Sequence, residues 1–161
     1  MNTATTLAPQ TDRVERQILI HAPRARVWQA LTTAEAFGTW FGAKLQGQTF
    51  APGQRVRGPI TICNYEHVWF DALIERMEPM ELFSYRWHPY AVDPDVDYEL
   101  EERTLVTFTL QDVAGPATLL KVVESGFDKL PPQRRLQAFP MNDQGWAAQL
   151  DNIARHVTAA N

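Results

Sequence analysis

The feature of this sequence that most constrains its fold is a change of hydrophobic period toward the C-terminal end. From Lys44 to about Leu130, short runs rich in β-branched and aromatic residues alternate with turn-forming stretches such as "APGQ", "MEPME" and "VAGP". In "NDQGWAAQLDNIARHVTAA" the apolar residues instead follow helical spacing, at Trp146, Leu150, Ile153 and Val157. The pattern predicts an antiparallel meander followed by one long amphipathic helix.

The N-terminal part predicts one strand and two short helices before the meander. "VERQILIHAP" alternates with period 2 up to Pro23, and proline suits the first turn of the helix predicted through "PRARVWQALT". Thr32 and Glu35 have the spacing of a capping box, which predicts a second helix through "TAEAFGTWFG". Because the long helix must bury its apolar stripe, we expect an α+β fold in which a curved sheet grips that helix.

Length and composition set the broad class of protein. The chain has 161 residues, of which 45% are hydrophobic, and this suits one domain over residues 13–161 after a polar, disordered tail over residues 1–12. It carries 15 Lys and Arg against 19 Asp and Glu without a basic stripe, so a nucleic-acid partner is not expected. No apolar run reaches the roughly 20 residues of a membrane span, and no signal peptide is recognisable. We expect a cytoplasmic protein.

Catalytic and metal-binding motifs are scarce. The sequence has no phosphate-binding loop, dinucleotide fingerprint, G-x-S-x-G motif or paired-cysteine site, so no cofactor and no metal are predicted. The single cysteine, Cys63, is interpreted as a small buried hydrophobe, and a Cys63–His67 nucleophile is disfavoured. By strand alternation, His21 and His88 fall on outward positions.

An acidic run precedes the fifth predicted strand, at Asp93, Asp95, Asp97, Glu99 and Glu101. Calcium loops of this spacing need a glycine at the sharp turn, where this sequence has Tyr98. We therefore interpret the run as a solvated acidic loop.

The segment "FSYRWHP" carries an aromatic ring on every second residue, at Phe83, Tyr85 and Trp87. Strict alternation predicts a strand with the three rings on its inner face. The same reasoning turns Phe70 and Phe108 inward. The rings either fill a core or line a cavity, and the residues alone leave that choice open.

Glu124 is a carboxylate in phase with the inward residues Leu120 and Val122. A buried carboxylate is costly unless it is paired or hydrogen-bonded. Glu124 could orient a ligand, pair with Arg16 or Tyr85, or lie at the solvated end of its strand.

Several quoted segments resemble START-like domains, the superfamily of the major birch-pollen allergen, and in particular the activators of heat-shock protein 90 ATPase. The resemblance runs from about Arg13 to Val157. Its most specific pieces are Ala22-Pro23 with Val27-Trp28 and Leu31, the Trp40-Phe41-Gly42 end of the second short helix, and Gly145-Trp146 at the start of the predicted last one. It implies a helix-grip fold of about six or seven strands with an elongated apolar cavity between sheet and long helix.

Proteins of this fold include lipid binders, cyclases, coenzyme carriers and co-chaperone domains, so the resemblance leaves three hypotheses in a ranked order. The first is binding of a small, mostly apolar molecule. The second is a cyclase or hydrolase with Glu124 as general base beside Tyr85, and the third is a protein-interaction module of the co-chaperone kind. The predicted cavity lining is Trp40, Phe41, Phe70, Phe83, Tyr85, Trp87, Phe108, Val122, Glu124, Trp146 and Leu150.

Overall fold

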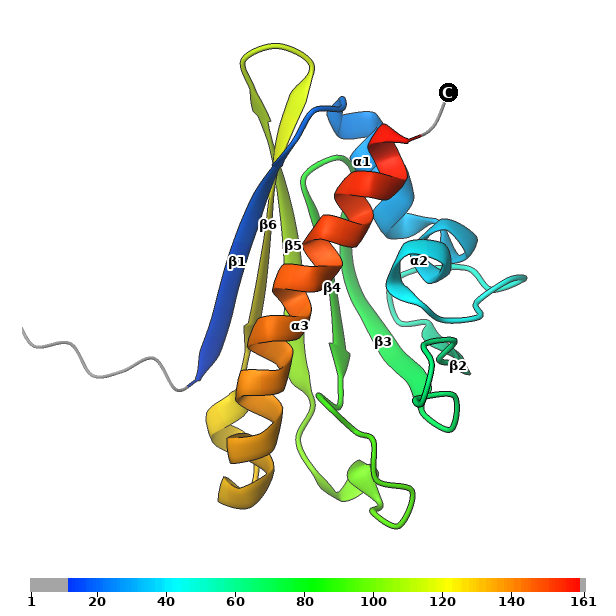
Figure 1. The fold of residues 1–161 in the computed structure, drawn as a ribbon, viewed down its shortest axis with the longest axis vertical. Coiled ribbons are helices and arrows are strands. Elements are labelled where there is room, and N and C mark those ends of the chain that lie inside the picture. The colour runs from blue at the N-terminus through cyan, green and yellow to red at the C-terminus, as the bar shows by residue number, and fades with distance from the viewer. Residues whose placement is uncertain (1–11, 160–161) are drawn as a thin grey trace, which may run out of the picture.

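The computed structural model describes residues 12–159, which form a curved six-stranded antiparallel sheet with helices on one side (Figure 1). Its strand order is β1-β6-β5-β4-β3-β2, so the meander predicted after residue 44 is confirmed. The first strand, β1, adds to one edge of the meander by pairing with β6. The strands are β1 (Arg13–Ile20), β2 (Arg55–Pro59), β3 (Trp69–Glu78), β4 (Leu82–Trp87), β5 (Thr104–Val113) and β6 (Ala117–Ser125).

Three α-helices cover the inner face of this sheet. They are α1 (Arg24–Thr32), α2 (Ala34–Phe41) and α3 (Pro132–Thr158), and single 3₁₀ turns occupy η1 (Tyr98–Leu100) and η2 (Phe127–Lys129). Figure 1 shows α3 running obliquely across the sheet, with α1 and α2 beside its C-terminal half. The predicted α+β helix-grip architecture, with two short helices after the first strand and a long one at the end, is confirmed.

The inner face is built by the predicted alternation. Phe83, Tyr85, Phe108 and Val122 are all fully buried. The register places Phe83 opposite Phe108, and Phe108 in turn opposite Val122. On β3, Phe70, Ala72 and Ile74 are buried, while the alternate residues Trp69 and Leu73 are exposed. Sheet and helix therefore enclose a continuous aromatic and aliphatic core.

The apolar stripe of α3 is confirmed, since Trp146, Leu150, Ile153 and Val157 are all buried. The helix itself begins at Pro132, well before the Asn142 with which the predicted segment starts. Its first half is hard to recognise because Pro140 interrupts the pattern and Leu136 is 71% exposed. This extra length brings the start of α3 alongside the loop between β4 and β5.

Two local predictions are wrong. Thr32 does not cap α2: it is the last residue of α1, and its hydroxyl donates to the Trp28 carbonyl at 2.7 Å, while Thr33 occupies the N-cap position without a side-chain bond. Cys63 is exposed rather than buried, because it lies in the irregular loop between β2 and β3.

The predicted tail over residues 1–12 lies outside the described residues except for Asp12. This residue belongs to the folded part, since its carbonyl accepts from the backbone N–H groups of Gly126 and Phe127, both at 3.1 Å. Within residues 12–159, no helix has the length and apolar character needed to cross a bilayer.

Candidate functional site

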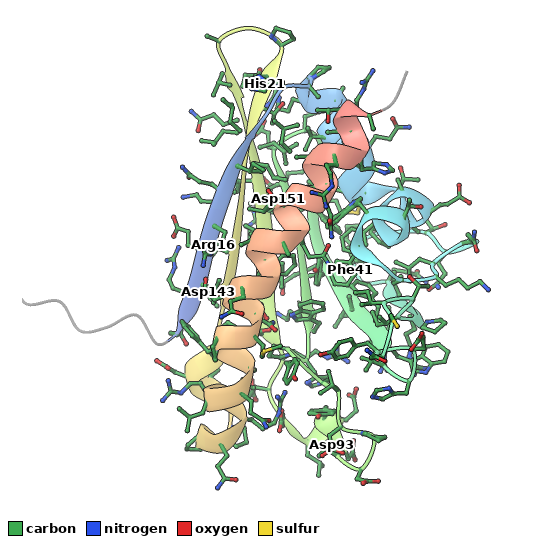
Figure 2. The ribbon with its side chains drawn as sticks, in the orientation of Figure 1. Arg16, His21, Phe41, Asp93, Asp143 and Asp151 are labelled. Atoms are coloured by element: carbon green, nitrogen blue, oxygen red, sulfur yellow. The ribbon has the colours of Figure 1, made fainter. Side chains whose placement is uncertain are left out.

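A pocket of about 680 Å³ opens at one end of the sheet, beside the middle of α3, which lines it with residues between Met141 and Asn152. Two loops complete it: residues 60–68 between β2 and β3, and residues 88–103 between β4 and β5. His67 joins the two loops, because its Nε2 lies 3.1 Å from the Val92 carbonyl oxygen. Figure 2 places Asp93, which also lines the pocket, in the second loop at this end of the molecule.

Four aromatic rings form the apolar wall of the pocket: Phe41, Phe70, Trp87 and Trp146. Their centroids are separated by 5.2 Å for Phe41 and Phe70, 5.9 Å for Phe70 and Trp87, and 5.7 Å for the two tryptophans. These separations suit tilted or edge-to-face aromatic contacts. The four rings thus make one connected surface contributed by α2, β3, β4 and α3.

The end of α2 is shaped to place Phe41 in this wall. Gly42 ends the helix with a φ of 102°, a conformation that side-chain-bearing residues rarely adopt. A Cβ at this glycine would also lie only 2.8 Å from the Cγ1 atom of Ile62, a residue of the pocket rim. The Phe41 carbonyl is held in turn by the Gln149 amide of α3 at 2.9 Å.

The structure brings those four predicted lining residues to the pocket and leaves the other seven away from it. Trp40, Phe83, Tyr85, Phe108, Val122, Glu124 and Leu150 are buried in the core and do not line the pocket. The difference arises because the alternation of a strand fixes which side chains point inward, whereas the packing of the helices decides which of those meet empty space.

Glu124 lies fully buried behind the two tryptophans of the wall. Its Oε2 accepts from Trp87 Nε1 at 2.7 Å and from Thr104 Oγ1 at 2.6 Å. Its Oε1 accepts from Trp146 Nε1 and Asn142 Nδ2, both at 2.8 Å. An ionised carboxylate offers about four acceptor sites, so these four donors occupy it. Through them the carboxylate joins β4, β5, β6 and α3.

Burial raises the pKa of Glu124 above its ordinary value, and the four hydrogen bonds offset only part of that effect. The suggested partners of Glu124 differ from those observed. Arg16 instead donates to Asp143 Oδ1 at 2.9 Å between β1 and α3, as Figure 2 indicates. Tyr85, whose pKa is raised well above its usual range by burial and by the nearby Glu124, makes no hydrogen bond through its hydroxyl within the described residues.

Sequence reasoning recognised the acidic loop but found neither its place beside the pocket nor the residue that holds it. Arg134, at the start of α3, donates to both carboxylate oxygens of Glu101, at 3.0 and 3.1 Å, and to the Pro89 carbonyl at 2.7 Å. Its guanidinium also lies over the Tyr98 ring, 4.6 Å from the centroid. Arg134 therefore fixes both ends of residues 89–101, although nothing in the local sequence indicates this role.

The rim of the pocket combines apolar residues with paired charges. Four of the large apolar side chains that are exposed in the described chain lie here: Ile62, Trp69, Val96 and Met141. Beside them Arg55 binds Asp71 through two hydrogen bonds of 2.8 and 2.7 Å, and Arg103 lies 3.2 Å from Glu99. These arginines hold the pKa of the Asp71 carboxyl below its ordinary value against the effect of burial.

His88 is the histidine for which the predicted surface position is wrong. Its side chain is only 7% exposed, and it lines the pocket. The alternation that turned it outward ends with β4 at Trp87, so it does not determine the direction of the His88 side chain. Across the described residues, no group of three or more His, Cys, Asp or Glu side chains is arranged to hold a metal ion.

The comparisons with known proteins agree with this fold. Residues 21–158 match the family described as "Activator of Hsp90 ATPase homolog 1-like protein". The chain belongs to this family. The resemblance predicted from the sequence is therefore confirmed. A comparison with curated protein sequences gives no match.

Solved structures show the same fold at low identity. The protein MLL2253 from Mesorhizobium loti is 23% identical, with a TM-score of 0.71 over 92% of this chain and 98% of that one. A protein from Arthrobacter aurescens is 13% identical, with a TM-score of 0.73 over 98% and 94%. DynU16, from the dynemicin biosynthetic locus, is 24% identical with a TM-score of 0.67, and the match covers 93% of this chain but 48% of DynU16. At these identities the likeness concerns the fold alone.

Proposed function

We propose that this member of the family binds a small, mostly apolar molecule in the pocket between α3, the end of the sheet and the two loops. The observation that carries the proposal is the connected wall of Phe41, Phe70, Trp87 and Trp146 around a space of about 680 Å³. Ligand sites of this size are typically lined by apolar and aromatic groups with a few polar ones. The exposed apolar residues of the rim support the same conclusion, since such residues commonly gather at binding sites.

The other two hypotheses have less support. Catalysis by Glu124 would need a carboxylate oxygen free to take a proton from the substrate, but each oxygen already accepts two hydrogen bonds and the residue does not line the pocket. A co-chaperone role rests on family membership alone.

The proposal is tested by titrating the protein with N-phenyl-α-naphthylamine, a neutral probe whose emission rises in apolar surroundings. Gly145 supplies a blocking variant: it lines the pocket from α3, and no atom lies within 4 Å of a Cβ built on it. A Gly145→Phe variant can therefore fold with its ring in or across the pocket, and replacing a helical glycine favours the helix. Gln144→Phe is the matched control, because Gln144 is an exposed neighbour on α3 that does not line the pocket.

We expect saturable binding to the wild type and to Gln144→Phe, and a loss of at least about tenfold in affinity for Gly145→Phe. Circular dichroism melts establish that both variants fold. An absence of saturable binding to the wild type would contradict the proposal, and so would equal binding to the two phenylalanine variants.

A further inference from the structure

The inner side of the pocket contains one buried polar side chain whose hydrogen-bonding groups are unused. The imidazole of His88 is 7% exposed, and both of its ring nitrogens are shielded from solvent without a hydrogen-bond partner among the described residues. Glu99 Oε2 lies 3.6 Å from Nε2, which is too far for a hydrogen bond. Buried polar groups normally have partners, because leaving one unsatisfied costs free energy.

We propose that His88 is the polar recognition site of the pocket and that the ligand carries a neutral hydroxyl group, as a phenol or an aryl alcohol does. This inference rests on the proposed binding function, which it makes more specific. A neutral imidazole has one N–H donor and one acceptor nitrogen, and a hydroxyl group can both accept and donate. The aromatic wall of the pocket would contact the apolar part of such a molecule.

The charges around His88 favour a neutral group over an ionic one. Arg103 is paired with Glu99 at 3.2 Å and lies 4.0 Å from Asp71, while Arg57 Nε lies 3.4 Å from the same aspartate. A ligand anion would meet the carboxylates of this cluster, and a ligand cation would meet its guanidinium groups. Since both signs are already paired within the protein, a neutral hydroxyl avoids breaking an ion pair.

His88 itself is suited to bind as the neutral imidazole. Burial and the neighbouring Arg103 lower the pKa of its ring, and the carboxylates of Glu99, Glu101 and Asp71 oppose this only in part. Two residues beyond His88, the backbone of Tyr90 lies in the left-handed region, with a φ of 48°. As the ring nitrogens are shielded, we expect the imidazole to turn, or residues 88–99 to shift, when a hydroxyl enters.

The test compares two probes that differ in one group, α-naphthol and α-methylnaphthalene, each measured by displacement of N-phenyl-α-naphthylamine. The variants are His88→Phe, which removes both polar atoms, and His88→Gln, which keeps a donor and an acceptor. His21→Phe is the control, since His21 is exposed and does not line the pocket. In parallel, the ring nitrogen resonances of His88 are followed by NMR in the wild type.

We expect the wild type and His21→Phe to bind α-naphthol at least about tenfold more tightly than α-methylnaphthalene. His88→Phe should lose this preference and bind the two probes within about twofold of each other, and His88→Gln should keep part of the preference. The His88 nitrogen resonances should shift with α-naphthol and not with α-methylnaphthalene. If His88→Phe fails to fold, His88→Gln and the NMR titration decide.

The outcomes separate this inference from the proposed function. If the wild type binds N-phenyl-α-naphthylamine and α-methylnaphthalene but shows no preference for α-naphthol, or if His88→Phe keeps the preference, the role of His88 is wrong and the pocket stands. If none of the three probes binds, both proposals are wrong.

Discussion

The inner face of the sheet has a filled half and a hollow half, and the same kind of residue builds both. In the filled half, Phe83 and Phe108 are fully buried and stack with centroids 6.1 Å apart, and Phe50 stacks on Phe83 at 5.6 Å. In the hollow half, Trp87 and Trp146 lie 5.7 Å apart and face the pocket. Phe83 and Trp87 belong to one strand, so an alternating aromatic pattern can lead into a packed core at one end and a cavity wall at the other.

What differs between the halves is an additional set of hydrogen bonds. Rings in both halves contact several other rings, as Phe83 and Trp87 both do. In the hollow half, where one side is open, both indole N–H groups also donate to the buried Glu124. A wall that borders empty space lacks packing on that side, and charge-assisted hydrogen bonds supply the missing constraint.

The largest expected effect is in the filled half. Phe83→Ala should lower the free energy of unfolding by about 3 to 5 kcal/mol, because the deleted ring leaves a cavity among closely packed aromatic groups. Since Phe83 does not line the pocket, probe affinity should change by less than about twofold. Urea denaturation and titration with N-phenyl-α-naphthylamine measure the two quantities. A stability loss below about 1 kcal/mol would mean that this half is not tightly packed.

Glu124→Gln should have the next largest effect, and it should act on both stability and binding. In the variant an amide NH₂ group replaces one carboxylate oxygen and cannot accept the hydrogen bonds that this oxygen accepts. One or two buried donors therefore lose their acceptor, and the free energy of unfolding should fall by about 2 to 4 kcal/mol. The indoles should lose their fixed orientation, and probe affinity should fall by about tenfold. Thr104→Val is the control, because it removes one donor to Glu124 from a residue outside the pocket wall. Equal probe affinity in wild type and Glu124→Gln would show that the carboxylate does not set the wall.

The pH dependence of stability, compared between the wild type and Glu124→Gln, tests the pKa shift of Glu124. Burial raises the pKa of this carboxyl in the fold above the ordinary 4.5. Between those two values the folded protein holds a proton that the unfolded chain has released, so the contribution of Glu124 to stability falls as pH rises through that interval. The stability advantage of wild type over Glu124→Gln should therefore be larger below the interval than above it. An advantage that grows with rising pH would reverse the sign of the shift.

The sequence predicts the two halves unequally. The element order, the inward rings of "FSYRWHP" and the buried stripe of α3 follow from periodicity, because side-chain direction is a local property of strands and helices. The pocket does not follow, since it depends on two irregular loops and on Arg134, which holds one of them from the start of α3. Pro140 and the exposed Leu136 conceal the part of the helix that carries Arg134.

The surroundings of Glu124 and His88 were also beyond a local reading of the sequence. Glu124 is recognisable as a buried carboxylate, but its donors come from positions 18 to 37 residues away in the chain. His88 follows the last residue of β4, where strand alternation no longer applies. Both sites depend on contacts between distant segments, which a single sequence does not reveal.

Arg134→Ala tests the loop over the hollow half. Arg134 and Glu101 are 12% and 10% exposed, so removing the guanidinium should cost about 1.5 to 3 kcal/mol, the usual range for a hydrogen bond to a charged group. Amide hydrogen exchange over residues 89–101 should accelerate, and probe affinity should fall several-fold. Arg135→Ala is the control, because Arg135 lies 3.9 Å from Asp128 in a more exposed pair and should change stability by less than about 0.5 kcal/mol. Unchanged exchange in Arg134→Ala would mean that the loop is held by other contacts.

The smallest effect on stability is expected at the rim, where binding can be separated from folding. Trp69 and Leu19 are large apolar residues of similar exposure, 54% and 48%, but only Trp69 lines the pocket. Substitution of either by alanine should change the free energy of unfolding by less than about 0.5 kcal/mol, since exposed side chains contribute little to packing. Arg57 lies over the Trp69 ring, 5.4 Å from its centroid, and restrains it at the pocket entrance. Trp69→Ala should weaken N-phenyl-α-naphthylamine binding by about three- to tenfold, whereas Leu19→Ala should leave it unchanged. If both variants bind the probe equally well, the rim contributes nothing, and the binding surface is confined to the four inner rings.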